Sequence, residues 1–447
     1  MNSPTVTPTF SIPNIRLFIA FKVFFNSRFY YPVFTILFLD FGLTVAQFSI
    51  LNAAWAATIV LAEVPSGALA DIIGRKRLLV FATFIMIIEI AIISFVPKTD
   101  PSIIFIVFLI NRILSGLAEA AASGADEAIA YDSLAAKGDI RQWGRVLEIL
   151  ARFQSFGFII AMSVGAAIYD PDLLEKICRF FGFANHFSQE TTMRFPLYLT
   201  LILAICAFIT TLRMEDPDPD PTESDNSRPQ IKQAFRLTLK AGLWILKTPF
   251  ALCVILFGML FDGIIRMVIT LSSQYYRVIE LPESTFGIIG SSVAMLGFVI
   301  PKIANNIAEK QSPAHALWIT TGLSITGLSF MSFFWPYAGL IPALITFSAM
   351  YFTGFFVSFY MNQVTSSDLR ATVLSFKGLA YNISYGVLGI LYALVLKIKK
   401  QALPEGSDEN ILFMDTFSGF PITFMIWFVL LLVVYFFALK KPSIPSE

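Results

Sequence analysis

The chain has 447 residues, of which 56% are hydrophobic and only 14% are charged, and its mean hydropathy is +0.72. Soluble domains carry roughly 25% charged residues, so this composition excludes a soluble globular protein and indicates an integral membrane protein. The formal net charge of +1 provides no basic field for a nucleic acid partner. Three scattered cysteines are too few for a disulfide framework or a zinc site, so we expect no metal and no cofactor.

Apolar runs of about 20 residues, long enough to cross a bilayer as a helix, occur twelve times along the chain. The segment before the first run lacks the basic, apolar and small-residue regions of a removable signal, which predicts a cytosolic start. The predicted spans are 17–39, 46–70, 78–96, 103–124, 146–168, 195–212, 250–271, 286–303, 316–335, 339–361, 371–396 and 420–439.

An acidic, proline-rich stretch, RMEDPDPDPTESDNSRPQ, follows the sixth span and has the composition of a flexible linker. After it, residues 231–246 place Lys232, Arg236 and Lys240 at four-residue spacing beside apolar residues. This pattern predicts a basic amphipathic helix, either on the membrane surface or as a solvated bridge. The predicted domains are a six-helix bundle in 1–212, a cytosolic linker with this helix in 213–248, and a second six-helix bundle in 249–447.

The distribution of basic residues predicts the orientation of the chain, because loops rich in Lys and Arg stay in the cytosol. With both termini inside, the inner segments carry more than twice as many Lys and Arg residues as the outer segments. The outer loop after the fifth span contains DLLEKICRFFGF, in which apolar residues recur at helical spacing. We expect a short helix there, resting on the outer leaflet.

Two residue patterns repeat between the halves of the chain. The intervals from Arg28 to Leu43 and Phe48 recur from Arg266 to Leu281 and Phe286. Similarly, RVLEILAR opens the fifth span with two basic residues seven apart, and RATVLSFK opens the eleventh in the same way. The repeats predict two pseudo-symmetric six-helix bundles, as many transporters have around a central site.

The arrangement of six spans, a long cytosolic loop and six spans resembles the major facilitator superfamily. The stretch GALADIIGRK resembles that family's motif between spans two and three, through Gly67, Asp71, Gly74, Arg75 and Lys76. An arginine followed four residues later by a glycine in span four, and the stretch SGADEAIAYDSL after it, resemble bacterial members. The antiporter-associated Gly/Pro pattern in span five is poorly met, because GFIIAMSVGAA has Gly157 and Gly165 but no proline.

The resemblance implies an alternating-access secondary transporter and not an enzyme. It further implies a multi-pass monomer in the cytoplasmic (inner) membrane, with both termini cytosolic, a small-molecule substrate and protons as the coupling ion. It also implies that the motif is a latch that holds one gate closed. We hypothesise that Asp71 bonds the start of span eleven or pairs with Arg145.

Ionisable side chains at membrane depth are costly and mark functional positions. The predicted substrate and coupling residues are Arg28, Glu63, Arg112, Glu119, Glu148, Arg152, Asp262, Arg266 and Lys377. Two of their pairs, Asp262 with Arg266 and Glu148 with Arg152, are four residues apart and could instead be structural ion pairs. Glu119 or Asp262 is the predicted proton carrier, and Glu89 is expected to be peripheral.

If both pairs form, the remaining basic residues outnumber Glu63 and Glu119, which favours an anionic or zwitterionic amphipathic solute. The alternatives are a multidrug/proton antiporter that exports cations, a lysolipid transporter or flippase, and a membrane receptor that transports nothing. An intramembrane enzyme would need a nucleophile with a base or a metal cluster, and neither H-E-x-x-H nor G-x-S-x-G occurs. Hence no catalytic residue is predicted.

Overall fold

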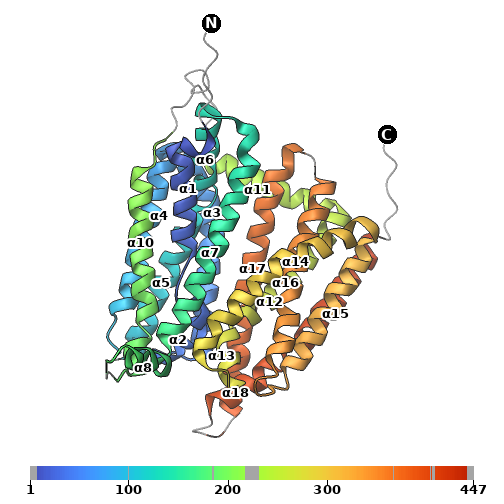
Figure 1. Ribbon diagram of the computed structural model, residues 1–447. Coiled ribbons are helices and arrows are strands. Elements are labelled where there is room, and N and C mark those ends of the chain that lie inside the picture. The colour runs from blue at the N-terminus through green and yellow to red at the C-terminus, as the bar shows by residue number, and fades with distance from the viewer. Residues whose placement is uncertain are drawn as a thin grey trace. The chain divides into compact units, whose positions relative to one another are not determined.

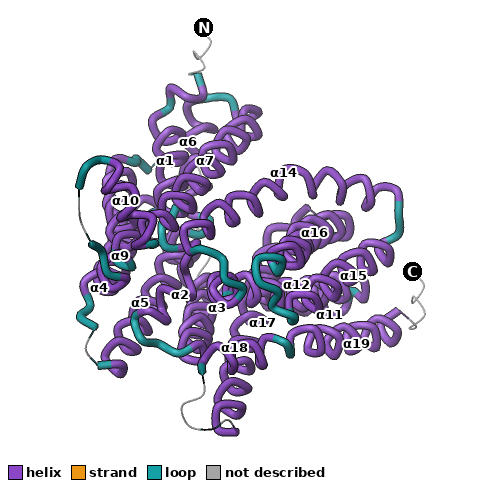
Figure 2. The backbone as a smooth tube through the Cα atoms, turned by 60° about the horizontal axis from the view of Figure 1, so that its bottom comes forward, coloured by secondary structure: helices purple, strands orange, loops and turns teal. Residues whose placement is uncertain are grey.

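The computed structural model describes residues 8–98, 100–183, 186–216, 231–365, 367–402, 404 and 408–439. In these residues all regular elements are α-helices or short 3-10 helices, and there is no strand (Figure 2). Ten helical segments of the described chain are long and apolar enough to cross a membrane. The chain is therefore an all-α, multi-pass membrane protein, as its composition predicts.

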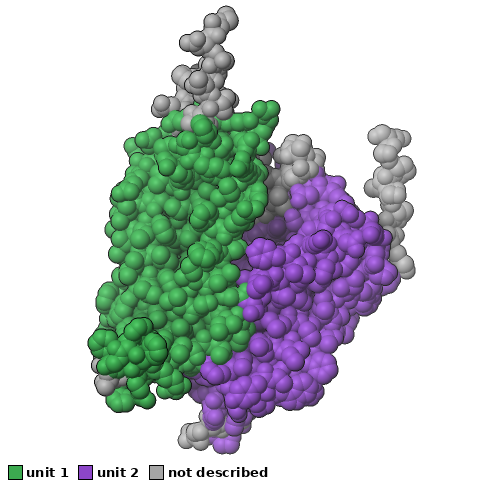
Figure 3. All heavy atoms as spheres, viewed as in Figure 1, with its two compact units in different colours: residues 1–43, 57–234, 283–291 green, residues 44–56, 235–282, 292–447 purple. Residues whose placement is uncertain are grey.

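The chain forms two compact units, which are coloured separately in Figure 3. Unit 1 consists of residues 1–43, 57–234 and 283–291, and unit 2 of residues 44–56, 235–282 and 292–447. Each unit therefore contains one short segment from the other half of the sequence. The predicted domain boundaries at residues 212 and 249 stay a prediction, since packing alone does not test which parts move together.

Unit 1 is built around α1, which contacts α6, α7 and α10. Apolar side chains of α1, α6 and α7, among them Phe18, Leu134 and Leu150, form a buried cluster. In Figure 1, α6 lies at the same end of unit 1 as the start of α1, and α8 lies at the opposite end. The helices of this unit, with part of α3, are α1 (Pro13–Asn26), α2 (Phe34–Asp40), α3 (Val45–Ile73), α4 (Arg75–Phe95), α5 (Pro101–Ala122), α6 (Ala125–Lys137), α7 (Trp143–Tyr169), α8 (Pro171–Phe180), α9 (Gln189–Thr192) and α10 (Phe195–Arg213). Its 3-10 helices are η1 (Thr9–Ser11), η2 (Tyr31–Val33), η3 (Ile140–Gln142) and η4 (Glu283–Thr285).

Unit 2 is built around α12, which contacts α16, α17 and α19 and is buried over most of its length. Helix α19 is apolar on all sides and leaves many large aliphatic side chains exposed, as expected of a helix that faces lipid. The helices of this unit, with the last part of α11 and most of α14, are α11 (Ile231–Lys247), α12 (Pro249–Thr270), α13 (Ser272–Val278), α14 (Phe286–Lys310), α15 (Pro313–Met331), α16 (Leu340–Val364), α17 (Ser367–Ala402), α18 (Glu409–Phe417) and α19 (Phe420–Leu439).

The predicted spans agree closely with these helices. Each span from the second to the twelfth corresponds to one helix, and the predicted helices at 172–183 and 231–246 are α8 and α11. The first span is the exception, because it is broken into α1, η2 and α2. Helices α6, α13 and α18 were not predicted, since each is short and none is a continuous apolar run.

Residues 44–56 belong to unit 2 and residues 283–291 to unit 1, and each segment makes a close backbone contact within that unit. In unit 2 the start of α3 packs on α17, where a Cβ atom on Gly389 would lie 3.2 Å from the carbonyl oxygen of Ser49. In unit 1 the start of α14 packs on α7, where a Cβ atom on Gly287 would lie 2.1 Å from the carbonyl oxygen of Met162. These two helix pairs occupy corresponding places in the repeat, because spans five and eleven are its predicted counterparts.

Candidate functional site

The break in the first span lies within unit 1, at residues 27–30, and places Arg28 outside regular helix. Pro32 cannot donate a backbone hydrogen bond, which weakens a helix at this point. The backbone N–H of Phe29 donates instead to the Thr200 hydroxyl, at 3.1 Å. A Cβ atom on Gly165 of α7 would lie only 1.8 Å from the carbonyl oxygen of Phe29, so the irregular backbone is tightly enclosed. Such backbone is tolerated at membrane depth only where protein surrounds it.

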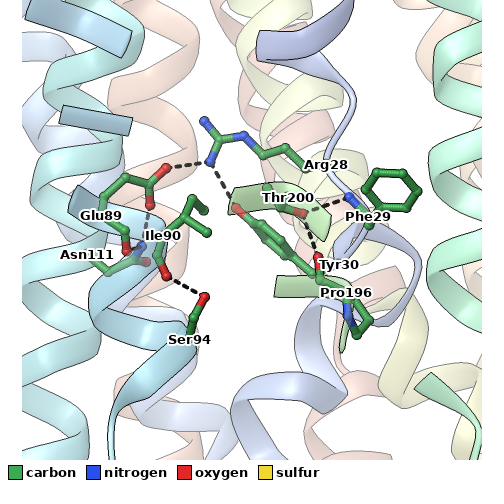
Figure 4. A network of polar contacts seen from close by, with 9 residues as sticks. All are labelled: Arg28, Phe29, Tyr30, Glu89, Ile90, Ser94, Asn111, Pro196 and Thr200. Carbon is green, nitrogen blue, oxygen red and sulfur yellow. Dashed lines mark hydrogen bonds and ion pairs between the residues drawn. The ribbon is translucent and has the colours of Figure 1, made fainter. Parts of the chain in front are cut away.

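The Arg28 side chain belongs to a buried polar network (Figure 4). Its guanidinium forms an ion pair with Glu89 of α4, with 2.7 Å between Nη1 and Oε1, and donates to the Tyr30 hydroxyl at 3.0 Å. Asn111 of α5 donates to the carboxylate of Glu89 and, at 2.8 Å, to its main-chain oxygen. Arg28 is 2% exposed and Glu89 is completely buried. The expectation that Glu89 is peripheral is therefore wrong.

Arg112 follows Asn111 on α5 and lies close to the same network. Its guanidinium carbon is 5.3 Å from the centre of the Phe34 ring, and that of Arg28 is 5.9 Å from the Phe25 ring, both within cation–π distance. Further along α5, Glu119 is half-buried, as is Glu63 on α3. Unit 1 thus brings together two arginines, the carboxylate of Glu89 and the rings of Phe25 and Phe34.

Unit 2 contains a second polar cluster, centred on α12. Asp262 and Arg266 form the ion pair that their four-residue spacing allows, with 2.5 Å between Oδ2 and Nη2. Arg266 also donates to the Asn382 side chain at 3.0 Å, and its guanidinium carbon lies 5.4 Å from the centre of the Tyr385 ring. Asp262 is buried, whereas about a quarter of the Arg266 side chain is exposed.

Close approach of α17 to α12 brings further polar groups to this cluster. A Cβ atom on Gly258 would lie 1.9 Å from the Tyr381 hydroxyl, so only glycine leaves room for that ring. Within the described residues the buried Tyr381 hydroxyl makes no hydrogen bond. Lys377, one turn before it, lies 6.0 Å from the centre of its ring.

Glu148 and Arg152 also form their four-residue ion pair, at 2.5 Å on α7. Their side chains are 58% and 74% exposed, unlike those of the Arg28–Glu89 and Asp262–Arg266 pairs. Surface pairs of this kind contribute at most about 1 kcal/mol. The structure therefore places them apart from the buried network of unit 1.

The basic residues of the GALADIIGRK motif contact acids within unit 1. Arg75 forms an ion pair with Asp132 of α6, and the backbone N–H of Lys76 donates to the Asp216 carboxylate at 2.9 Å. Gly74 has a φ of +93°, in the left-handed region that favours glycine. Gly67 is exposed on α3.

The hypothesised partners of Asp71 remain untested, because its side chain and those at the start of α17 lie outside the described residues. The other proposed partner, Arg145, has its guanidinium carbon 6.0 Å from the centre of the Phe10 ring. The latch therefore stays a prediction.

Several polar residues of unit 1 were missed in the sequence. Lys22 of α1 forms an ion pair with the buried Asp126 of α6, and the Asn14 side chain donates to Ser133 at 2.7 Å. The signal was present, since Lys22 interrupts the first span just as Arg28 does, and SGADEAIAYDSL contains the acids. Within the described residues, no group of three or more His, Cys, Asp or Glu side chains is placed to hold a metal ion.

Comparisons with solved structures show the same fold. The nucleoside transporter NupG is 15% identical, with a TM-score of 0.70 over 96% of this chain and 99% of that one. A bacterial homologue of the human lysosomal transporter Spinster, in an inward-facing and unoccupied conformation, is 15% identical, with a TM-score of 0.68 over 98% and 100%. A D-xylose–proton symporter is 13% identical, with a TM-score of 0.64 over 97% and 96%.

A search among curated proteins found no match. The sequence profile of the Major Facilitator Superfamily, by contrast, matches residues 16–389, which include both polar clusters. The motif, the all-helical fold and this match agree: the chain belongs to the Major Facilitator Superfamily of membrane transporters.

Proposed function

We propose that this transporter moves a small anionic or zwitterionic amphipathic organic solute by alternating access, coupled to protons. The observation that supports this is the charge of the two polar clusters. In unit 1 two buried arginines, Arg28 and Arg112, accompany one buried carboxylate, Glu89. In unit 2 the charge of Arg266 is balanced by Asp262, which leaves Lys377.

The excess positive charge favours a substrate with a carboxylate, phosphate or similar group. Excess positive charge in a buried site is costly, and a bound anion offsets that cost. The half-buried Glu119 lies on the same helix as Arg112 and would suit the cationic end of a zwitterion. The phenylalanine and tyrosine rings around both clusters would contact an apolar part of the substrate.

The proton is assigned to Glu119 in preference to Asp262. A carboxyl group that carries a proton must exist in both the charged and the neutral form during the cycle. Asp262 is ion-paired with Arg266, and a fixed basic partner opposes protonation of a carboxylate. Among the described residues no ion pair is found on Glu119. The D-xylose–proton symporter among the similar structures is consistent with proton coupling on this fold.

The proposal is tested with purified protein in liposomes that carry a pH gradient. Uptake is measured for organic anions, zwitterions, cationic dyes and lysolipids. Transport should be restricted to the first two groups and should move protons in a measurable ratio. Transport of cationic dyes alone would overturn the assignment of charge, and transport of lysolipids alone would make the protein a lipid transporter.

Variants then test the residues. Lys377→Gln should reduce the apparent affinity for an anionic substrate at least tenfold, while Lys377→Arg should retain most of it. Lys302→Gln, an exposed lysine of α14 in the same unit, is the matched control. Glu119→Gln should abolish proton-driven accumulation but leave substrate exchange, whereas Asp262→Asn should impair both. If Glu119→Gln still accumulates substrate in response to a pH gradient, the assignment of the proton to Glu119 is refuted.

We further propose that the protein lies in the cytoplasmic membrane as a monomer, with both termini in the cytosol, and that residues 1–212 and 249–447 move as the two bundles. The distribution of Lys and Arg supports the orientation. Reporter fusions at each terminus test it. Asp71→Asn tests the latch, because it should change the accessibility of single cysteines on the two sides of the membrane; unchanged accessibility would exclude that role.

A further inference from the structure

A cavity of about 300 Å³ lies in unit 2, at the end of the bundle predicted to face the cytosol. Its walls come from the start of α12, the start of α15, the end of α16 and the end of α19. Most of the lining is apolar, including Phe250, Leu317 and Leu431. Because α19 is apolar on all sides, the cavity lies beside a helix that faces lipid.

One wall of the cavity carries a buried hydroxyl. Tyr360 is 6% exposed, and its hydroxyl makes no hydrogen bond to any residue that the structure describes. Leaving such a group buried and unsatisfied costs about 1–3 kcal/mol. A ligand that accepts a hydrogen bond from Tyr360 would remove this cost.

The N-terminus of α15 lies on the same cavity, through Ser312, Pro313 and Ala314. The Ser312 side chain does not cap this 19-residue helix, although its carbonyl oxygen accepts from the N–H groups of His315 and Ala316 at 2.9 and 3.4 Å. A helix N-terminus carries a partial positive charge that attracts phosphate. Pro313 has no N–H and those of His315 and Ala316 are occupied, which leaves the N–H of Ala314 in this turn.

The charged residues near the cavity are mainly basic. The exposed Lys310 is two residues before Ser312, and the exposed Lys247 is three residues before Phe250, so both lie within about 11 Å of the lining along the chain. The acid next to Lys310, Glu309, accepts a hydrogen bond from Asn305 at 2.9 Å, one turn back along α14. The charge carried by the chain next to the cavity lining is thus mainly positive, which favours an anion.

We propose that this cavity binds an anionic phospholipid of the cytosolic leaflet, with an acyl chain between α12, α15 and α19 and the phosphate at the start of α15 beside Tyr360. An acyl chain gains little by leaving other lipid tails for an apolar cavity. Affinity must therefore come from the headgroup, and binding depends on headgroup charge. This site is separate from the proposed transport function, which uses the Asp262 cluster.

Cys253 also lines the cavity and provides a reporter. Replacing the other two cysteines, Cys178→Ser and Cys206→Ser, leaves it as the one thiol of the full-length protein. The rate of its alkylation by a maleimide is measured in detergent with dioleoyl phosphatidylglycerol, dioleoyl phosphatidylcholine, oleate or inorganic phosphate. Phosphatidylglycerol should slow the reaction at least fivefold, and the other three less than twofold.

Two variants separate the headgroup from the cavity. Tyr360→Phe should weaken protection by phosphatidylglycerol at least threefold, whereas Tyr392→Phe, a buried tyrosine of α17 whose hydroxyl bonds to Thr416, should not. Leu317→Trp should fill the cavity and slow alkylation without lipid. Equal protection by phosphatidylcholine, protection by oleate or phosphate alone, or protection by none of the probes would each overturn the proposal.

Discussion

Replacing Glu89 by Gln tests the buried network of unit 1 most directly. The glutamine keeps the shape of the side chain but leaves the Arg28 guanidinium, 2% exposed, without a counter-charge. Its amide also places an NH₂ group opposite either Arg28 or Asn111, both of which donate to Glu89. Breaking a buried pair in this way costs about 3–5 kcal/mol. For a chain of this size that corresponds to a fall in melting temperature of roughly 3–5 °C.

The assay is thermal unfolding of the purified protein in detergent, followed by intrinsic fluorescence. Glu148→Gln is the matched control, because it removes the acid of an exposed pair and should cost less than about 1 kcal/mol. Removing both buried charges, in Arg28→Gln with Glu89→Gln, should recover more than half of the loss. If Glu89→Gln melts at the same temperature as Glu148→Gln, the buried Arg28–Glu89 ion pair does not stabilise the fold more than an exposed pair does.

Two further predictions concern helix packing and the outer loop. Gly287→Ala should destabilise the protein by about 1–3 kcal/mol, because its Cβ atom would lie 2.1 Å from the carbonyl oxygen of Met162. The control is Gly386→Ala, whose Cβ atom would lie 3.5 Å from the Cβ atom of Ala56, an ordinary contact distance. It should be neutral or stabilising in the same melting assay. Equal melting temperatures would contradict the contact. The backbone N–H of Phe187 donates to the Glu175 carboxylate and holds the pKa of that carboxyl below its usual range. The hydrogen bond is therefore fully present above the ordinary glutamate pKa, and it is lost as the pH falls through the lowered pKa. Exchange protection of the Phe187 amide, corrected for intrinsic rates, should fall across that acidic range, and Glu175→Gln should remove the pH dependence; a profile unchanged by the substitution would contradict it.

The sequence predicts the membrane helices well because a span needs only length and apolar composition. It does not predict the break at Arg28, since the run as a whole is apolar and the break depends on Thr200 and Gly165, far along the chain. Pro32 was a local signal for it.

The candidate site was predicted in part. Ion pairs at four-residue spacing, such as Asp262 with Arg266, follow from helix geometry and are present. The pairing of Arg28 with Glu89 joins residues 61 positions apart, and no spacing rule indicates it. Glu89 looked peripheral because its neighbours on α4 are uniformly apolar, yet that burial is the reason why it needs a basic partner.

Two of the helices divided between the units, α3 and α14, also carry the interior prolines Pro65 and Pro301. A helix of 29 residues such as α3 is about 43 Å long and nearly rigid, so a force on one end reaches the other. A proline in its interior removes a backbone hydrogen bond and makes bending easier at that point. Each of these two helices therefore bends most easily at its proline, within the unit that holds that part of the helix.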